Sequence, residues 1–390
     1  MQSSSVAGIL GLLACAVCMS GCSLLAVQNE LQWSSIDAES SEPRMVVVLL
    51  DGTRNSPDSK TNVSALNDAF RTSGKRALVD YIPGVGTATG TQALGAILGF
   101  TMEEGVQKGY RFLSANARPQ DKILIFGFSR GAHQARSLAG LIAYAGLIDQ
   151  PAAAQVGLRD ANKVIEAIKP LSDAAVQDRF AAAPDLPPAK VIVEAETGFR
   201  MRTAAVDFLG LWDTVPGSSF KDYGDCREMP NSEPGDRYKT GSYPLVRHIA
   251  HAVALDEKRS KYNPLLLCAP IIPSKTVLNE VWFAGAHADV GGGYTDGELQ
   301  SISLDWMVDQ ARGATNGRLP VAPPGSPLGL AHWSFGSGPA SFGSECSDRR
   351  IPPGAQMHRS VAERVSAGRA EINLQGTRSV QPYPRRCDPS

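Results

Sequence analysis

A serine between two glycines is the first candidate for chemistry in this sequence. Ser129 lies in the segment GFSRG, residues 127–131, which has the G-x-S-x-G spacing of a nucleophile elbow. In such an elbow the serine occupies a strained turn between a strand and a helix, and the glycines let neighbouring backbone approach closely. An apolar run precedes Ser129 and a helix-forming run follows it, so the spacing predicts a serine nucleophile.

A nucleophilic serine needs a base and an acid, and both have candidates later in the chain. Asp213 follows the apolar run AAVDFLGLW, residues 204–212, and His287 follows EVWFAGA, residues 280–286. The order serine, aspartate, histidine is that of an α/β-hydrolase triad. Each candidate also follows a predicted strand, where parallel sheets gather their functional side chains. We therefore expect His287 to take the proton of Ser129 and Asp213 to orient the imidazole.

Other carboxylates and histidines compete for these two roles. Asp289 is the second candidate for the acid, although its place in the Gly-rich segment DVGGG also suits a brace for that loop. His358, in the C-terminal part of the chain, is the reserve base. The remaining candidates are interpreted as structural, because a lone histidine or a carboxylate within a strand is usually a packed, hydrogen-bonded group. They are Asp207, His133, His248 and His251, and the last two lie in a run that is predicted to be helical.

Ester cleavage by a serine also needs two hydrogen-bond donors for the developing oxyanion. In an elbow the residue after the nucleophile supplies one, which here is the backbone N–H of Arg130. The second donor comes from the loop after an early strand, and Asp51-Gly52-Thr53 occupies that place. We expect the Thr53 amide to donate, alone or with its hydroxyl, while Gly52 permits close approach and Asp51 organises the loop.

Four apolar runs lack the alternation of a half-buried strand, so they predict strands that are buried on both faces. Helical patterns separate them, at residues 62–72, 91–116 and 131–147. Strands that alternate with helices indicate the α/β class, a mostly parallel central sheet flanked by helices. The four predicted strands are residues 45–53, 122–126, 204–212 and 280–286.

An Ala-rich insertion separates the serine unit from the third predicted strand. Residues 149–190 contain helical patterns at 161–168 and 173–183. Such an insertion fits either a cap over the site or additional surface helices. With this insertion, the catalytic domain is predicted to span residues 44–312.

The composition changes after Arg312, because Pro and Gly cluster in residues 313–390. We expect this C-terminal extension to be irregular but packed on the domain, since its aromatic side chains need burial. A short helix is predicted at residues 358–365.

The N-terminus has the features of an export signal. The apolar run at residues 6–19 is too short to span a bilayer comfortably but matches the core of a signal peptide. The sequence MSGC, ending at Cys22, resembles a bacterial lipobox, in which cleavage leaves a lipid-modified cysteine. A plain secretory signal and an uncleaved anchor are the alternatives. We predict a signal peptide at 1–22 and a tether at 23–43. Ser23 would follow the modified cysteine, and its resemblance to the sorting rules of Gram-negative bacteria predicts an outer-membrane lipoprotein facing the periplasm.

Cysteine usage agrees with export. Beyond Cys22 the chain has four cysteines, which an oxidising compartment can pair into two disulfides. The favoured pairs are Cys226–Cys268 and Cys346–Cys387. No CxxC pair lies outside the signal, so a zinc site is not expected.

The composition is that of an ordinary globular protein. The chain has 390 residues, of which 43% are hydrophobic and 20% charged, and its formal net charge is −1. This length suits one large domain or two modest ones. Without a basic block, nothing favours nucleic-acid binding. No metal or organic cofactor is implied, although carboxylate and backbone oxygens near Asp289 would also suit calcium.

A set of ordered motifs resembles one α/β-hydrolase family, long labelled a domain of unknown function, that includes the phospholipase effectors of type VI secretion. The resemblance covers about residues 45–365 and places the family's serine, aspartate and histidine on Ser129, Asp213 and His287. It implies an α/β-hydrolase fold and lipase chemistry. The motifs are DGTRN (51–55), TN (61–62), YIPGVGT (81–87), GFSRGA (127–132), GLWDTVPG (210–217), HAVALDEKR (251–259) and VWFAGAHADVGGGY (281–294), followed by MHRSVAER (357–364).

Two features depart from that family. His133 stands where the family commonly has an aromatic residue after GFSRGA. The predicted lipobox at Cys22 has no use in an effector that a secretion machine delivers, so the resemblance implies lipase chemistry without a toxin role.

The leading hypothesis is a serine esterase that acts on phospholipid or other acyl esters at the membrane through an acyl-enzyme. A lipid anchor would raise the local concentration of such a substrate. Two alternatives stay open: a catalytically silent envelope lipoprotein that binds a partner, and an acyltransferase with the same triad. The complete set of Ser129, Asp213 and His287 disfavours the first, whereas the second differs only in the acceptor.

Overall fold

The computed structural model describes residues 42–84, 102–149, 157–216, 241–336 and 344–387. The predicted signal peptide with Cys22, most of the predicted tether, and Cys226 lie outside these residues.

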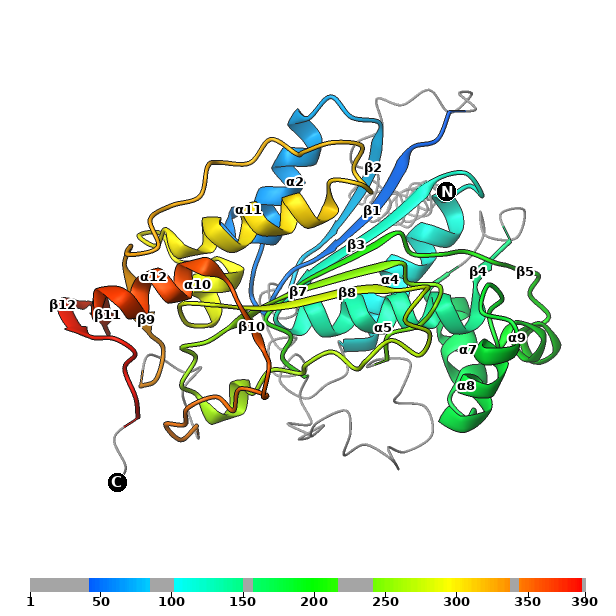
Figure 1. The fold of residues 1–390 in the computed structure, drawn as a ribbon. Helices are drawn as coiled ribbons and strands as arrows, with labels where there is room; N and C mark the ends of the chain where they lie inside the picture. The colour runs from blue at the N-terminus through cyan, green and yellow to red at the C-terminus, as the bar shows by residue number, and fades with distance from the viewer. Residues whose placement is uncertain (1–41, 85–101, 150–156, 217–240, 337–343, 388–390) are drawn as a thin grey trace, which may run out of the picture. The chain divides into compact units, whose positions relative to one another are not determined.

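A seven-stranded sheet forms the centre of the fold (Figure 1), with strand order β10-β8-β7-β6-β3-β1-β2. Each neighbouring pair of these strands is parallel, which confirms the predicted α/β class. The strands are β1 (Met45–Leu50), β2 (Ala77–Ile82), β3 (Lys122–Phe128), β6 (Phe208–Trp212), β7 (His248–Ala254), β8 (Val277–Phe283) and β10 (Gln356–Met357).

The central strands are buried on both faces, as their continuous apolar runs predict. Every residue of β1 and β6 is buried, and β3 is buried except for its first residue, Lys122. All four predicted strands are confirmed, although β1 ends at Leu50 rather than residue 53, β6 begins later than residue 204 and β8 ends before residue 284.

The helix-like interpretation of the run around His248 and His251 was wrong, because this run is strand β7. Its sequence HIAHAVA is rich in alanine, which favours helix, but burial between β6 and β8 overrides that local preference. Both histidines have structural contacts. His251 accepts from the Thr214 N–H at 3.1 Å and lies 2.9 Å from Glu280 Oε2. The ring of His248 packs edge-on against a phenylalanine of β6.

Two helical layers cover the sheet (Figure 1). Helices α2 (Asn62–Thr72) and α11 (Leu299–Ala311) share a hydrophobic core with Val47 and Leu49 on one face of β1. Helices α4 (Met102–Asn116) and α5 (Arg130–Ala145) form a second core on the other face. The alternation of side chains along β1 therefore divides the interior into two cores.

The two predicted helices of the Ala-rich insertion are α7 (Leu158–Ile168) and α8 (Asp173–Ala182), and α9 (Lys190–Thr197) follows at its end. These helices lie beside the C-terminal end of α5 (Figure 1), where the Ala189 N–H donates to the Tyr144 carbonyl at 2.8 Å. Tyr144 lies roughly 20 Å along the helix axis from Ser129. This arrangement favours surface helices over a cap above the serine.

The described part of the C-terminal extension combines loops with regular elements. Strand β10 joins the main sheet beside β8, and β9, β11 and β12 form a separate three-stranded sheet. The predicted helix at 358–365 is α12. The bounds are β9 (Ala331–Trp333), α12 (Arg359–Ala367), β11 (Arg369–Leu374) and β12 (Thr377–Pro382).

The smaller elements are η1 (Pro57–Ser59), η3 (Ser260–Tyr262), β4 (Leu147–Ile148), β5 (Met201–Arg202) and α10 (His287–Gly291). A disulfide joins Cys346 to Cys387, as predicted. The other predicted pair includes Cys226 and stays a prediction. Among the helices of the described residues, none is both long and apolar enough to cross a membrane.

Candidate active site

Ser129 occupies the strained turn that its motif predicts. It caps the N-terminus of α5 directly after β3. Its φ of 58° lies in a backbone region that residues other than glycine rarely adopt. Its N–H donates to the Trp212 carbonyl at 3.0 Å. The motif glycines are sterically required, because a Cβ on Gly127 would lie 2.4 Å from the Gly131 carbonyl oxygen, and one on Gly131 would lie 2.2 Å from the Leu50 oxygen.

Asp213 and His287 meet at the carboxyl ends of neighbouring strands. Asp213 follows β6 and is fully buried, while His287 begins α10 shortly after β8 and is 6% exposed. His287 Nδ1 lies 2.6 Å from Asp213 Oδ2. The ring of Phe128, the residue before Ser129, lies 4.7 Å from the imidazole centre. The fold thus brings the histidine–aspartate pair to the end of the strand that leads into the serine.

Four hydrogen bonds hold the Asp213 carboxylate. His287 supplies one, the Ala254 N–H donates to Oδ1 at 2.9 Å, and the guanidinium of Arg349 donates to both oxygens, at 2.6 and 2.9 Å. Burial by itself raises the pKa of Asp213, but the charge of Arg349 and the bond to His287 outweigh it. The pKa therefore lies well below its usual range, and Asp213 is ionised.

Asp289, the second candidate for the acid, bonds elsewhere. One of its oxygens accepts the N–H groups of Ala286 and His332, each at 2.9 Å. The other lies 2.7 Å from Nδ1 of His332. These contacts suit the predicted role as a brace for the loop, while the imidazole of His287 is bonded to Asp213.

Glu257 is a buried carboxylate behind His287. It accepts the backbone N–H of His287 at 3.2 Å, the Ser334 hydroxyl at 2.7 Å and two bonds from Arg259, each at 2.8 Å. Burial raises its pKa, but Arg259 outweighs this and lowers the pKa to about 2. The Arg259 guanidinium lies 3.6 Å over the ring of Tyr262, and that ring contacts the imidazole edge-on.

The loop after β1, which carries the predicted oxyanion donor, lies against the serine turn. A Cβ on Gly52 would lie 3.2 Å from the Ser129 Cβ. Asp51 organises this loop by accepting the Gly52 N–H at 2.7 Å and the Thr61 hydroxyl at 2.6 Å. The Thr53 hydroxyl is buried and has no hydrogen-bond partner in the described part of the chain. Arg130, whose N–H is the other predicted donor, is the first residue of α5.

The remaining candidates have structural contacts. His358, the reserve base, caps α12 by accepting the Ser360 N–H, and its ring stacks on Phe283 at 4.6 Å. Asp207 accepts from the Ile123 N–H at 2.9 Å. His133 is buried in the first turn of α5, and the described contacts do not explain why a histidine stands there.

Sequence reasoning missed Arg349, Glu257, Ser334 and His332 as parts of the site. Glu257 lies in HAVALDEKR, one of the motifs that carry the family resemblance, and this position was the signal that could have identified it. Arg349 has no such signal, because its segment has no periodic pattern and reaches Asp213 only through the tertiary fold.

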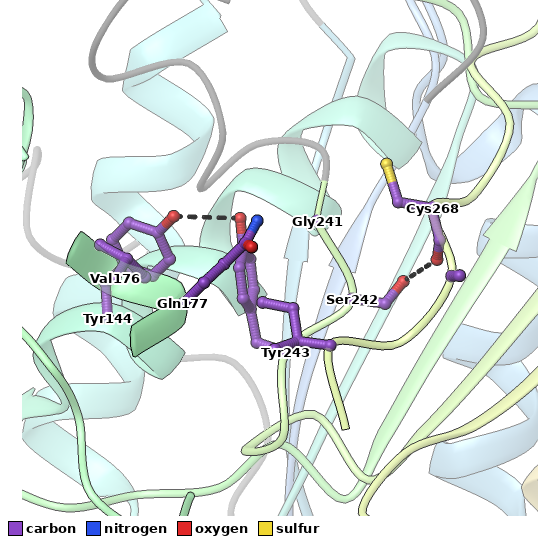
Figure 2. Close-up of a pocket in the computed structure, with 9 residues that line it drawn as sticks. Tyr144, Val176, Gln177, Gly241, Ser242, Tyr243 and Cys268 are labelled. Atoms are coloured by element: carbon purple, nitrogen blue, oxygen red, sulfur yellow. Dashed lines mark hydrogen bonds between the residues drawn. The ribbon is translucent and has the colours of Figure 1, made fainter. Parts of the chain in front are cut away.

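A separate cavity lies far from the candidate triad. It has a volume of about 70 Å³ and lies between α8 and the segments around Tyr243 and Cys268 (Figure 2). Two hydrogen bonds join residues of its lining: the hydroxyls of Tyr144 and Tyr243 lie 3.2 Å apart, and the Ser242 hydroxyl donates to the Cys268 carbonyl. We therefore do not interpret it as the substrate site.

Residues 44–310 match the family model described as the type VI secretion phospholipase effector Tle1-like catalytic domain. The chain belongs to this family. An uncharacterized protein of Saccharomyces cerevisiae is 26% identical over 260 residues, which are 60% of this chain and 34% of that protein. The chain therefore spans about a third of the length of this relative.

The solved structures that resemble this chain superpose on it with low TM-scores. An uncharacterized protein from Pseudomonas aeruginosa is 17% identical with a TM-score of 0.35, over 73% of this chain and 47% of that one. The Tle1 effector bound to the VgrG spike is 19% identical with a TM-score of 0.30, over 69% and 55%. Esterase 2 of Thermogutta terrifontis is 11% identical with a TM-score of 0.36, over 75% and 89%.

Proposed function

We propose that the protein is a serine hydrolase that cleaves carboxylic esters of phospholipids through Ser129, His287 and Asp213. The observation that carries the proposal is the strained serine turn beside a buried histidine–aspartate pair, in a chain that belongs to a family of phospholipase effector catalytic domains.

In the proposed reaction, the hydroxyl oxygen of Ser129 attacks the ester carbonyl carbon while its proton passes to Nε2 of His287. The backbone N–H of Arg130 and the loop at Thr53 stabilise the oxyanion. The intermediate collapses, the alcohol leaves with the proton from His287, and an acyl-serine remains. Water then attacks the acyl-serine with His287 as base, which releases the fatty acid and restores the serine.

The charge state of Asp213 supports this assignment of roles. An ionised carboxylate 2.6 Å from Nδ1 makes this nitrogen the proton donor of the pair. Nε2 is then unprotonated in the neutral imidazole and acts as the base.

Two arginines beside the serine favour an anionic substrate. Arg130 follows Ser129 and Arg54 lies in the loop after β1. Burial lowers the pKa of the Arg130 guanidinium, Tyr262 acts in the opposite direction, and the like charge of Arg54 lowers the pKa further. A phosphate group near the scissile ester would be attracted to them. A neutral diacylglycerol would lack this attraction.

The test compares the purified protein with Ser129→Ala on phosphatidylglycerol and on diacylglycerol of the same acyl chains. We expect turnover only with Ser129 and a preference for the phospholipid that Arg54→Gln weakens. Turnover by Ser129→Ala equal to that of the wild-type protein would contradict the assignment of Ser129 as the nucleophile. Absence of turnover together with absence of fluorophosphonate labelling would favour the partner-binding alternative. Acyl transfer to an added alcohol in excess of hydrolysis would favour the acyltransferase.

We also propose that the protein is an outer-membrane lipoprotein anchored through Cys22, so that its membrane substrate is concentrated around it. The lipobox-like sequence before Cys22 supports this. Labelled palmitate should enter the protein in cells and should be lost in Cys22→Ala.

A further inference from the structure

The chain beyond residue 310, which the family model does not match, supplies partners to four carboxylates around the candidate site, three of which are buried. Each carboxylate belongs to the matched part of the chain and would lack that partner without the extension. The four pairs, with the extension residue first, are Ser334–Glu257, His332–Asp289, Tyr383–Asp256 and Arg349–Asp213.

Arg349 binds the proposed catalytic acid with both arms of its guanidinium. Nη1 donates to Asp213 Oδ1 at 2.6 Å and Nη2 to Oδ2 at 2.9 Å, a planar two-bond fork. The same nitrogens donate to the main-chain carbonyls of Ala254 and Tyr262. The Arg349 side chain is 2% exposed. Because the bonds to these two main-chain carbonyls fix the guanidinium, it holds the Asp213 carboxylate in the orientation that contacts His287.

The charge of Arg349 also governs the electrostatics of the Asp213–His287 pair. A lone buried carboxylate strongly favours a protonated imidazole beside it. The guanidinium offsets part of the negative charge of Asp213 and is the main charged group that lowers the pKa of this carboxyl. Other charged or titratable groups near His287 in the described part of the chain include Glu257, Arg259 and Tyr262.

The segment that carries Arg349 is fastened to the domain at its flanks. Cys346 forms a β-bridge with Arg259, and the Lys258 ammonium lies 2.6 Å from Asp348 Oδ1. The Cys346–Cys387 disulfide ties the same segment to the C-terminal end of the described chain. Residues 344–350 form no helix, so these ties, rather than local secondary structure, define the position of Arg349.

We propose that Arg349 is a positioning residue for the catalytic acid, and that the Cys346–Cys387 disulfide keeps it on Asp213. The proposal rests on the hydrolase function proposed above. It makes the C-terminal extension a part of the active site, and it makes turnover dependent on one disulfide.

The first test compares Arg349→Gln with Arg350→Gln, the exposed neighbour, in the purified full chain. Arg349→Gln should lower kcat on the order of 10²-fold, since a shift of about 1 Å at a catalytic group has that effect. KM should change little, because Arg349 is buried away from solvent. Loss of the cation should move the acidic limb of the pH–rate profile to higher pH. Arg349→Lys keeps the charge without the two-bond fork. Relative to Arg349→Gln, it should therefore bring the pH–rate profile closer to that of the wild type than it brings kcat.

The second test removes the tie, in Cys346→Ser/Cys387→Ser. This variant should also lower kcat. Combined with Arg349→Gln, it should lower kcat no further than Arg349→Gln does alone, because both changes act on the same contact. Independent, additive losses would overturn the role of the disulfide. Thermal melting checks the fold of each variant, and the lysine and cysteine variants carry the test if Arg349→Gln does not fold.

A third readout does not depend on hydrolysis. The proton between His287 Nδ1 and Asp213 should produce a low-field proton NMR signal that Arg349→Gln shifts or abolishes and Ser129→Ala leaves unchanged. Failure of the proposed function would appear as turnover that does not require Ser129, and this signal would still decide the role of Arg349. A wild-type signal, kcat and pH profile in Arg349→Gln would overturn the proposal.

Discussion

His332 and Asp289 repeat, outside the candidate triad, the pairing that His287 makes with Asp213. Nδ1 of His332 lies 2.7 Å from Asp289 Oδ1, and its Nε2 lies 3.1 Å from Asp296. The ring of Tyr294 stacks on the imidazole at 3.6 Å. Two nearby carboxylates make this second pair a structural joint between the Gly-rich loop and β9.

This joint predicts a pH-dependent contribution to stability. Burial alone lowers the pKa of His332, but Asp289 and Asp296 outweigh burial and raise it above the ordinary 6.5. The contribution is therefore fully present below pH 6.5 and is lost as the pH rises through the higher folded value. His332→Gln should flatten the dependence of the free energy of unfolding on pH between about 6 and 8. Denaturant titrations across this range measure it, and an unchanged slope would contradict the assignment.

Asp213 and Asp289 should differ in what their loss does. Asp213→Asn should lower kcat by roughly 10⁴-fold, because the amide favours the wrong imidazole tautomer. Asp289→Asn should instead cost about 1–3 kcal/mol in the free energy of unfolding, since it leaves buried donors poorly paired. Kinetics and urea titrations of the two variants separate these effects. A greater kinetic loss in Asp289→Asn would make Asp289 the acid.

The glycines of the serine turn should not tolerate a side chain. Gly131→Ala would drive its Cβ into the Leu50 carbonyl, so a backbone shift is required, at a cost of about 1–3 kcal/mol. Activity should fall more than stability, because the shift displaces Ser129. Gly313→Ala is the matched control, since no atom lies within 4 Å of its added Cβ. Comparable melting temperatures for the two variants would argue against the required close approach.

Glu257 should stabilise the fold in a way that acid removes. Its folded pKa of about 2 lies below the ordinary 4.5, so its contribution is present above pH 4.5 and is lost as the pH falls toward 2. Glu257→Gln leaves Arg259 buried without its counter-charge and should cost about 3–5 kcal/mol. Acid unfolding of the variant should begin from a lower stability and show a shallower pH dependence between 4.5 and 2. A slope equal to that of wild type would exclude Glu257 as its source.

The serine turn and its flanking strands could be predicted because their signals are local. Continuous apolar runs predicted β1, β3, β6 and β8, and the G-x-S-x-G spacing predicted the turn at Ser129. Strand β7 was missed because its alanines and histidines favour helix locally, whereas its neighbours in the sheet decide its conformation.

The sequence alone determined the parallel α/β fold, the elbow, and Asp213 and His287 as residues that follow strands, since strand ends are placed by the sheet itself. Only the tertiary structure decided that His287 bonds Asp213 while Asp289 bonds His332, and that Arg349 reaches the acid from 136 residues away along the chain. Contacts of this kind depend on how loops and the C-terminal extension pack in space, and neither hydrophobic periodicity nor a short motif encodes that packing.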